Sequence, residues 1–258
     1  MATRRLAILA HYDADRRVRG YILHHLRRLR EECDEIHFVS TVALGPAELD
    51  KVRPFCARAF LKQNVGYDFH MWKHAIGVVD LGAWDELLLT NSSVLGPLGS
   101  LRPVFQRMER SACDFWGMTD NAELARHVQS YFIVFRRAAL GSAAFREFFA
   151  SVLPYRDKGQ VIRSYEVGLT RYLEDQGLTS DVVSPQAEVK LPFWMGKKAR
   201  FGGNPTCNYP VALLKHGMPY VKIEVLRDNP SQVPLGPVLA AMREAGYDMS
   251  LVDFDRRG

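Results

Sequence analysis

The sequence of 258 residues has only four cysteines and no long hydrophobic run. The cysteines form no C-x-x-C pair and lack zinc-ligand spacing, so we interpret them as ordinary buried thiols in a reducing compartment. No apolar stretch reaches the roughly 18 residues that span a membrane. The apolar residues 6–10 end at His11 and Asp13, which is too short for a signal peptide. We therefore expect a cytoplasmic protein, and leave open contact with the inner face of the cytoplasmic membrane.

The common catalytic signatures are also missing. The sequence contains no G-x-S-x-G, no Walker A motif, no H-E-x-x-H and no G-x-G-x-x-G. These absences argue against a serine hydrolase, a P-loop NTPase, a zinc protease and a dinucleotide-dependent dehydrogenase.

The composition is that of a folded globular protein, with 47% hydrophobic and 24% charged residues. The 34 basic residues exceed the 29 acidic ones and give a net charge of +5. This excess favours an anionic partner, which leaves a nucleotide, a phosphorylated sugar, a nucleic acid or a membrane surface as candidates. Because the excess is small and no nucleic-acid motif is present, we expect no nucleic-acid partner.

Short apolar runs alternate with amphipathic stretches along the chain. The runs predict strands at residues 6–10, 35–40, 58–63, 86–90, 114–118, 130–135 and 220–225. The amphipathic stretches predict helices at residues 18–33, 69–79, 100–109, 138–152 and 160–174, and residues 185–210 are expected to be irregular. This order is typical of an α/β fold with a mainly parallel mixed sheet and helices on both faces. With no repeat or linker, we expect a single domain.

Polar clusters follow several predicted strands directly. Ligands of parallel sheets bind beyond the carboxyl ends of the strands, so these clusters are candidate binding residues. They are Ala10, His11, Tyr12 and Asp13, then Asn91, Ser92 and Ser93, then Thr119, Asp120 and Asn121. The first cluster is also compatible with a simple turn in which Asp13 caps the next helix.

The loop at residues 64–69 is a further candidate. Gly66 allows a tight turn, Tyr67 offers a ring for stacking, and Asp68 either caps the following helix or binds ribose or sugar hydroxyls. A plain capped loop is the alternative.

The sequence gives little support for a metal. Mg²⁺ and Mn²⁺ prefer carboxylate ligands, whereas the strand end at Asn91, Ser92 and Ser93 carries only neutral oxygens. The acidic pairs at 13–15 and 253–255 lie too early in the sheet and in the tail, so a Mg or Mn cofactor is disfavoured and no cofactor is predicted with certainty.

Three more side chains and one helix are candidates for function. Glu166 either stabilises a helix N-terminus or acts as a general base, and His127 and Gln129 either bind a sugar or satisfy a loop. The first predicted helix carries six arginines, which form a solvated face or bind anionic lipid or phosphate. They are Arg16, Arg17, Arg19, Arg27, Arg28 and Arg30.

Nine segments, in order along nearly the whole chain, resemble the rhamnan synthesis protein F family. They lie at residues 10–13, 38–40, 64–69, 85–98, 114–121, 129–132, 165–170, 204–206 and 227–230, the fourth reading Asp-Glu-Leu-Leu-Leu-Thr-Asn-Ser-Ser-Val-Leu-Gly-Pro-Leu. The resemblance implies a GT-A-type (Rossmann-like) glycosyltransferase that uses a donor such as dTDP-rhamnose and a lipid-linked or polysaccharide acceptor. The family often has an acidic residue where this chain has Ser92, which further weakens the case for a metal.

Together, the residues and the resemblance predict an inverting sugar transfer. Residues 1–110 are expected to bind the donor, with Ser40, Asn64, Gly66, Tyr67 and Asp68 beside the first two strand-end clusters. Residues 111–258 are expected to bind the acceptor through Trp116, Thr119, Asp120, Asn121, His127 and Gln129, with Glu166 as base. The expected diphosphate ligands are Lys73, Lys197, Lys198, Lys222 and Arg227.

A binding module without turnover is the alternative function. It would stack a sugar on aromatic rings, for which Tyr67, Trp72, Trp116 and Trp194 are the candidates.

Overall fold

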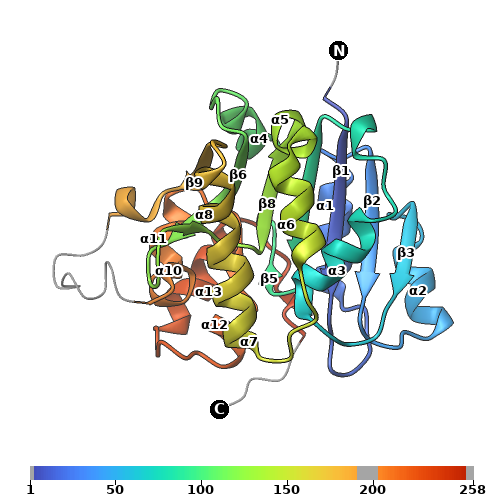
Figure 1. Ribbon diagram of the computed structural model, residues 1–258. Helices are drawn as coiled ribbons and strands as arrows, with labels where there is room; N and C mark the ends of the chain where they lie inside the picture. Colours follow the sequence, from blue (N-terminus) through green and yellow to red (C-terminus); the bar gives the residue numbers. More distant parts are fainter. Residues whose placement is uncertain (1–2, 191–202, 254–258) are drawn as a thin grey trace.

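A computed structural model describes residues 3–190 and 203–253 and shows a mixed sheet with helices on both faces (Figure 1). The sheet has eight strands in the order β3-β2-β1-β4-β8-β6-β7, with β9 beside β6. Its strands are β1 (Arg5–His11), β2 (Glu35–Ser40), β3 (Arg58–Leu61), β4 (Glu86–Asn91), β6 (Phe115–Asn121), β7 (His127–Val128), β8 (Phe132–Arg136) and β9 (Ser180–Ser184). β3, β2, β1 and β4 run parallel, and β8 is antiparallel to β4 and β6. The predicted fold class is confirmed.

Two helical layers cover the sheet. The front layer in Figure 1 contains α3 (Tyr67–Ile76), α5 (Arg137–Gly141), α6 (Ala143–Ser151), α7 (Lys158–Val161) and α8 (Val167–Asp175). The remaining helices are α1 (Gly20–Leu29), α2 (Pro46–Val52), α4 (Arg102–Met108), α10 (Pro205–Asn208), α11 (Pro210–Lys215), α12 (Ile223–Arg227) and α13 (Leu235–Glu244). Short 3₁₀ turns lie at Leu81–Ala83, Gln186–Glu188 and Met249–Leu251.

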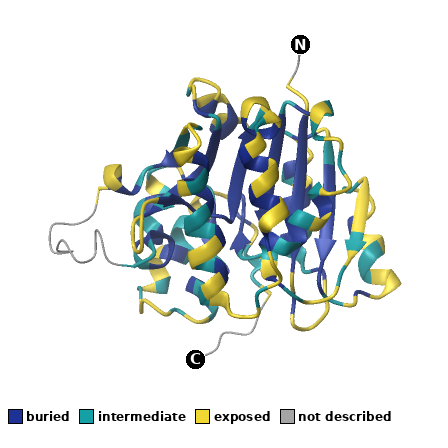
Figure 2. Cartoon of the chain, in the orientation of Figure 1, coloured by how far each residue is buried: buried dark blue, intermediate teal, exposed yellow. Residues whose placement is uncertain are grey.

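The two layers arise from the alternation of side chains along each strand. In β1, Leu6 and Ile8 pack with α3 and α6, whereas Ala7 and Leu9 pack with α1 on the other face. Figure 2 shows the central strands buried between the two layers. A strand buried on both faces is a continuous apolar run, which is why these strands could be predicted from the sequence.

Several predicted elements differ from the structure. Residues 220–225 are not one strand: β10 (Val221–Lys222) pairs with β5 (Val94–Leu95), and α12 begins at Ile223. The helix predicted at 138–152 is broken at Ser142, whose hydroxyl caps α6 by accepting from Phe145 N. The helix predicted at 160–174 contains a π-helical turn at Ile162–Glu166. The prediction missed β9, although Gly177 marks the end of the preceding helix, because Ser180–Ser184 contains only two apolar residues, Val182 and Val183.

Within the described residues, no helix is long and apolar enough to span a bilayer.

Candidate functional site

The carboxyl ends of β1, β2 and β4 meet at one edge of the sheet. The parallel registers place His11 opposite Ser40 and Ala10 opposite Asn91. His11 Nδ1 lies 3.0 Å from Ser40 Oγ, and burial lowers the pKa of His11 to about 4, so its imidazole is neutral at pH 7. The structure therefore brings the first predicted cluster, Ser40 and the β4 end together.

The loops after β1 and β4 are joined by backbone contacts. Tyr12 N donates to Ser92 Oγ over 3.0 Å, and Ser92 Oγ donates back to Tyr12 O over 3.2 Å. Asp13 is ion-paired with Arg19 and accepts from Asp15 N, so it closes a turn rather than capping α1. The Tyr12 ring is 48% exposed above this corner and is open to a ligand.

A hydrogen-bonded chain of four side chains crosses the β4 end. Asn91 Nδ2 donates to Asp68 Oδ2 over 2.8 Å, and Ser93 Oγ donates to Asn91 Oδ1 over 2.6 Å. Lys222 Nζ donates to Ser93 Oγ over 3.3 Å and lies 4.8 Å from the centre of the Tyr131 ring. The short antiparallel pairing of β10 with β5 carries Lys222 to this position. The chain links a carboxyl group to an ammonium group through two neutral side chains.

Asp68 titrates unusually high for an aspartate. Loss of hydration raises its pKa to about 6, and the negative charge of Glu166 also raises it, while the bonds from Asn91 and Phe69 N and the charge of Lys222 oppose these effects. Asp68 is half-buried and bonded to Asn91, so it is held away from free solvent.

Glu166 faces the same region from the front layer. It ends the π-helical turn, and Oε1 accepts from Ser130 N over 3.2 Å. Its charge acts on Asp68 and on the Tyr131 hydroxyl, while its side chain stays partly exposed. π-Helical turns recur at functional sites because one extra residue turns a side chain out of the regular helical position. Glu166 is therefore a half-exposed carboxylate beside the Asp68–Lys222 chain.

The backbone is strained where α3 begins. Gly66 has φ 78° and Tyr67 has φ 54°, a left-handed conformation that is costly for a residue with a bulky side chain. A Cβ on Gly66 would lie 2.5 Å from His70 Cβ and 2.8 Å from Pro154 Cα. This bend turns Asp68 toward Asn91 and leaves Tyr67 40% exposed. Asn64 lies exposed on the same loop.

Two of the tryptophans that were predicted to bind a sugar lie in the core. Trp116 is 1% exposed and packs against Phe105 and Phe132, so it belongs to the core and has no surface for a sugar. Trp72 is also fully buried, with Nε1 donating to Thr90 O. These two aromatic predictions are corrected, because apolar runs in buried strands and helices also supply tryptophans to the core.

The polar end of β6 is used for loop contacts. Thr119 is fully buried, Asp120 Oδ1 accepts from Gln186 N over 2.7 Å, and Asn121 Oδ1 accepts from Glu123 N over 2.9 Å. His127 is buried, with Nδ1 2.7 Å from Ala125 O. These contacts hold the β6–β7 corner together.

Gln129 lies closer to the candidate site. It precedes Ser130, whose N–H binds Glu166, and its Nε2 donates to Asn204 Oδ1 over 2.8 Å. Asn204 also caps α10 by accepting from Thr206 N. Asn204 is not among the site residues that were predicted from the sequence. The sequence signal that could have indicated its position is Asn204 followed by Pro205, a capping residue and a proline that are typical of a helix start.

The predicted phosphate ligands also separate. Lys73 Nζ donates to Ala150 O and Val152 O, which ties α3 to the end of α6. Arg227 pairs with Asp228, and its charge reaches Tyr21, whose hydroxyl lies 3.4 Å from Ser92 O. Lys222 alone of the three contacts the Asp68–Asn91–Ser93 chain. Lys197, Lys198 and Trp194 lie outside the described residues.

The donor groups present do not fit a divalent cation. Asn91 Oδ1 accepts from Ser93, Ser92 Oγ is bonded to the Tyr12 backbone, and Asp13 and Asp15 both pair with Arg19. Across residues 3–190 and 203–253, no three His, Cys, Asp or Glu side chains gather as ligands.

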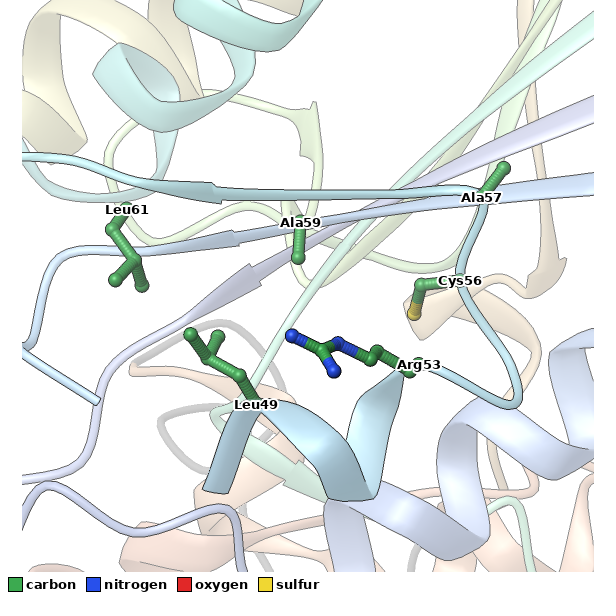
Figure 3. A pocket seen from close by; sticks show the side chains of 6 residues that line it. All are labelled: Leu49, Arg53, Cys56, Ala57, Ala59 and Leu61. Atoms are coloured by element: carbon green, nitrogen blue, oxygen red, sulfur yellow. The ribbon is translucent and has the colours of Figure 1, made fainter. Parts of the chain in front are cut away.

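A hollow of about 410 Å³ lies elsewhere, at the outer edge of the sheet (Figure 3). It is lined by Leu49, Arg53, Cys56, Ala57, Ala59 and Leu61, from α2, β3 and the segment between them. Figure 3 shows the Arg53 side chain extending across it. None of the strand-end polar residues lines this hollow, so it is separate from the site.

The sequence model of the family described as "Rhamnan synthesis protein F" matches residues 36–255. The chain belongs to this family. The match includes the β4 end, Glu166 and Lys222, and thus most of the site described above.

Two curated proteins are similar to the chain. A protein named "Virulence protein VirA" from Vibrio anguillarum is 29% identical over 197 residues, which cover 67% of this chain and 63% of that protein. "Uncharacterized protein y4gN" from Sinorhizobium fredii is 25% identical over 148 residues, 55% of this chain and 39% of that protein. The chain thus spans less than two thirds of the length of either relative.

Two solved structures resemble the fold at low identity. The glycosyltransferase GlyE of Streptococcus pneumoniae matches with 14% identity and a TM-score of 0.49, over 97% of this chain and 62% of that chain. The 4-diphosphocytidyl-2C-methyl-D-erythritol synthase of Anaerococcus prevotii matches with 12% identity and a TM-score of 0.46, over 70% and 86%.

Proposed function

We propose that the chain transfers a sugar from a nucleotide-sugar donor to a polysaccharide or lipid-linked glycan acceptor. Membership of a family described by rhamnan synthesis supports this assignment, and favours a rhamnosyl donor such as dTDP-rhamnose. The observation that carries the proposal is the placement of an ammonium and a half-exposed carboxylate around one strand end, Lys222 on one side and Glu166 on the other.

In this proposal, the donor lies over the ends of β1, β2 and β4. The exposed rings of Tyr12 and Tyr67 flank the base and sugar, and Lys222 contacts the diphosphate. The ammonium stabilises the negative charge that grows on the leaving diphosphate, which is the largest electrostatic demand of the reaction. Lys222 is held in place by its hydrogen bond to Ser93, which in turn donates to Asn91.

The acceptor hydroxyl attacks the anomeric carbon from the side opposite the leaving group. The bond from that carbon to the diphosphate oxygen breaks, its electron pair leaves with the nucleotide, and the hydroxyl proton passes to Glu166. A single displacement inverts the anomeric centre. Asp68 is the less suitable base, because its oxygens are bonded to Asn91 and Phe69 N.

The decisive test combines donor binding with turnover. A panel of sugar nucleotides is screened by thermal shift, because a bound ligand raises the apparent stability. The best donor is then assayed for nucleotide release and for transfer by Glu166→Gln and by Glu174→Gln, a matched change at an exposed position of α8. We expect Glu166→Gln to bind donor but to lose turnover by about 10²- to 10⁴-fold, and Glu174→Gln to behave as wild type.

The same assay distinguishes the alternative, a module that binds sugar nucleotides without turnover. The two exposed tyrosine rings favour this alternative, since stacking needs no base. Saturable donor binding with no nucleotide release would assign that function. A flat thermal shift across the whole panel would contradict both.

A further inference from the structure

A cationic surface lies beside the candidate site, formed by the end of β3 and the segment from α6 through α7. We call it the cationic rim, and define it as Lys62, Tyr67, Leu153, Arg156, Lys158 and Arg163. Gly66 packs against Pro154, and the Tyr67 hydroxyl lies 3.3 Å from Arg156 O, so the two parts of the rim are in contact. The rim lies at the lower edge of the sheet in Figure 1, toward which the arrowheads of β2 and β3 point.

The apolar side chains of the rim are held outward by an ordered backbone. Leu153 is 53% exposed, although its N–H and carbonyl are both bonded to the buried Tyr165 hydroxyl. Asp157 caps α7 by accepting from Gln160 N, which fixes the rest of the segment. Tyr67 is exposed through its left-handed backbone. The rim thus presents an exposed leucine and an exposed tyrosine beside its basic side chains.

Most of the positive charge of the rim is not balanced by nearby acidic side chains. Residues 62–67 and 153–163 contain four basic side chains and one acidic side chain, Asp157, which lies 3.8 Å from Arg163. Within the described part of the chain, Lys62, Arg156 and Lys158 pair with no carboxylate; Lys62 Nζ instead lies 3.0 Å from His70 Nδ1. This positive charge is complementary to an anionic surface.

The arginines of α1 contrast with this arrangement. Arg19 pairs with Asp13 and Asp15, Arg28 pairs with Glu31, and Arg30 donates to Asp34 O. On that face, Arg19 and Arg28 thus have their charge balanced by carboxylates. The rim offers both free cations and exposed apolar groups, the combination that binds the interface of an anionic bilayer.

We propose that the cationic rim is a docking surface for an anionic lipid membrane. Tyr67 and Asp68 are neighbours on the first turn of α3, and Asp68 is bonded to Asn91, so docking would place the candidate site at the membrane surface. This docking rests on the proposed function, because its purpose is to let a lipid-linked acceptor reach the site without leaving the bilayer.

Flotation of the full chain with vesicles tests the docking without donor or acceptor. We expect binding to vesicles of phosphatidylglycerol mixed with phosphatidylcholine, and little binding to pure phosphatidylcholine. The triple variant Lys62→Gln, Arg156→Gln, Lys158→Gln should bind the anionic vesicles about 100-fold more weakly, because each cation near such a surface contributes about 1 kcal/mol. Leu153→Ser should weaken binding by a smaller factor.

The matched control removes three exposed arginines elsewhere, by Arg27→Gln, Arg107→Gln and Arg110→Gln. This control should retain binding. Equal losses in both triple variants, no flotation of the wild type, or equal binding to neutral vesicles would overturn the docking. If only the proposed function were wrong, the wild-type chain would release no nucleotide but would still float with anionic vesicles.

Discussion

The ends of β4 and β6 carry similar polar triplets but use them differently. Asn91 ends β4, and Ser92 and Ser93 follow it. The Asn91–Ser93 contact continues to Asp68 on one side and to Lys222 on the other. The chain therefore ends in two ionisable groups, Asp68 and Lys222.

At β6, the side-chain oxygens accept from backbone N–H groups of neighbouring loops. Asp120 binds Gln186 N and pairs with Arg126, and Asn121 binds Glu123 N. A buried N–H left without an acceptor is costly, so these contacts stabilise the corner. The two ends therefore differ in what their side chains contact: the β4 end reaches two ionisable side chains, whereas the β6 end binds the backbone of neighbouring loops.

Replacing Lys222 should have the largest effect on the β4 end. Lys222→Met removes the ammonium from Ser93 and the Tyr131 ring, and we expect nucleotide release to fall by about 10²- to 10³-fold. Lys215→Met, on the exposed end of α11, is the matched control and should keep wild-type turnover. A change of only a few fold in Lys222→Met would remove the reason for treating the β4 end as special.

Asp68→Asn should alter how stability depends on pH. The folded wild type keeps the Asp68 proton up to a pKa of about 6, whereas an unfolded aspartate loses it near its usual, lower pKa. The folded state thus binds more protons in this interval, and wild-type stability falls as pH rises from about 4 to about 6.

Asp68→Asn has no proton to lose at this position, so its stability lacks this fall with rising pH. Relative to wild type, its free energy of unfolding should therefore improve by up to about 3 kcal/mol between about pH 4 and pH 7. Thermal melts of both proteins across this range measure the difference. Parallel pH curves would show that Asp68 titrates normally.

Asp120→Ala, at the β6 end, should change stability rather than donor binding. Losing the acceptor of Gln186 N and the pair with Arg126 should lower stability by about 1–3 kcal/mol. Donor binding, measured by calorimetry below the melting range, should stay at the wild-type value. Weaker donor binding at unchanged stability would make the two strand ends alike.

Ser93→Ala should give the smallest effect. It removes the hydrogen bond that the Lys222 ammonium donates to Ser93 and the bond that Ser93 donates to Asn91. The ammonium itself stays in place, so turnover should fall by only about fivefold, equivalent to about 1 kcal/mol. The kinetic comparison with Lys222→Met separates positioning from charge. A loss as large as that of Lys222→Met would mean that Ser93 itself contacts the donor.

Much of the fold could be predicted from the sequence. β1, β2 and β4 were expected within one residue of their observed ends, because strands buried on both faces are short apolar runs between polar breaks. The short β10 and the π-helical turn at residues 162–166 could not be predicted, since each depends on packing against distant segments rather than on a local pattern.

The site could be predicted in part. Residue types and strand positions singled out Asn91, Asp68, Glu166 and Lys222 among a larger set. The same reasoning also selected Trp116, which the structure places in the core against Phe105. Local sequence reports that a side chain is polar or aromatic, but burial depends on which face of the sheet the helices cover.

The sequence by itself determined the layered α/β fold, the polar strand ends and the positive charge, because periodicity and composition are local properties. Only the tertiary structure decided which polar groups meet. Asp68 and Lys222 are 154 positions apart in the printed sequence, and they join through Asn91 and Ser93 because parallel strands end at one edge and β10 pairs with β5 there. The raised pKa of Asp68 is also a tertiary property, since it results from lost hydration and from the nearby charge of Glu166, while Asn91 and Lys222 oppose it.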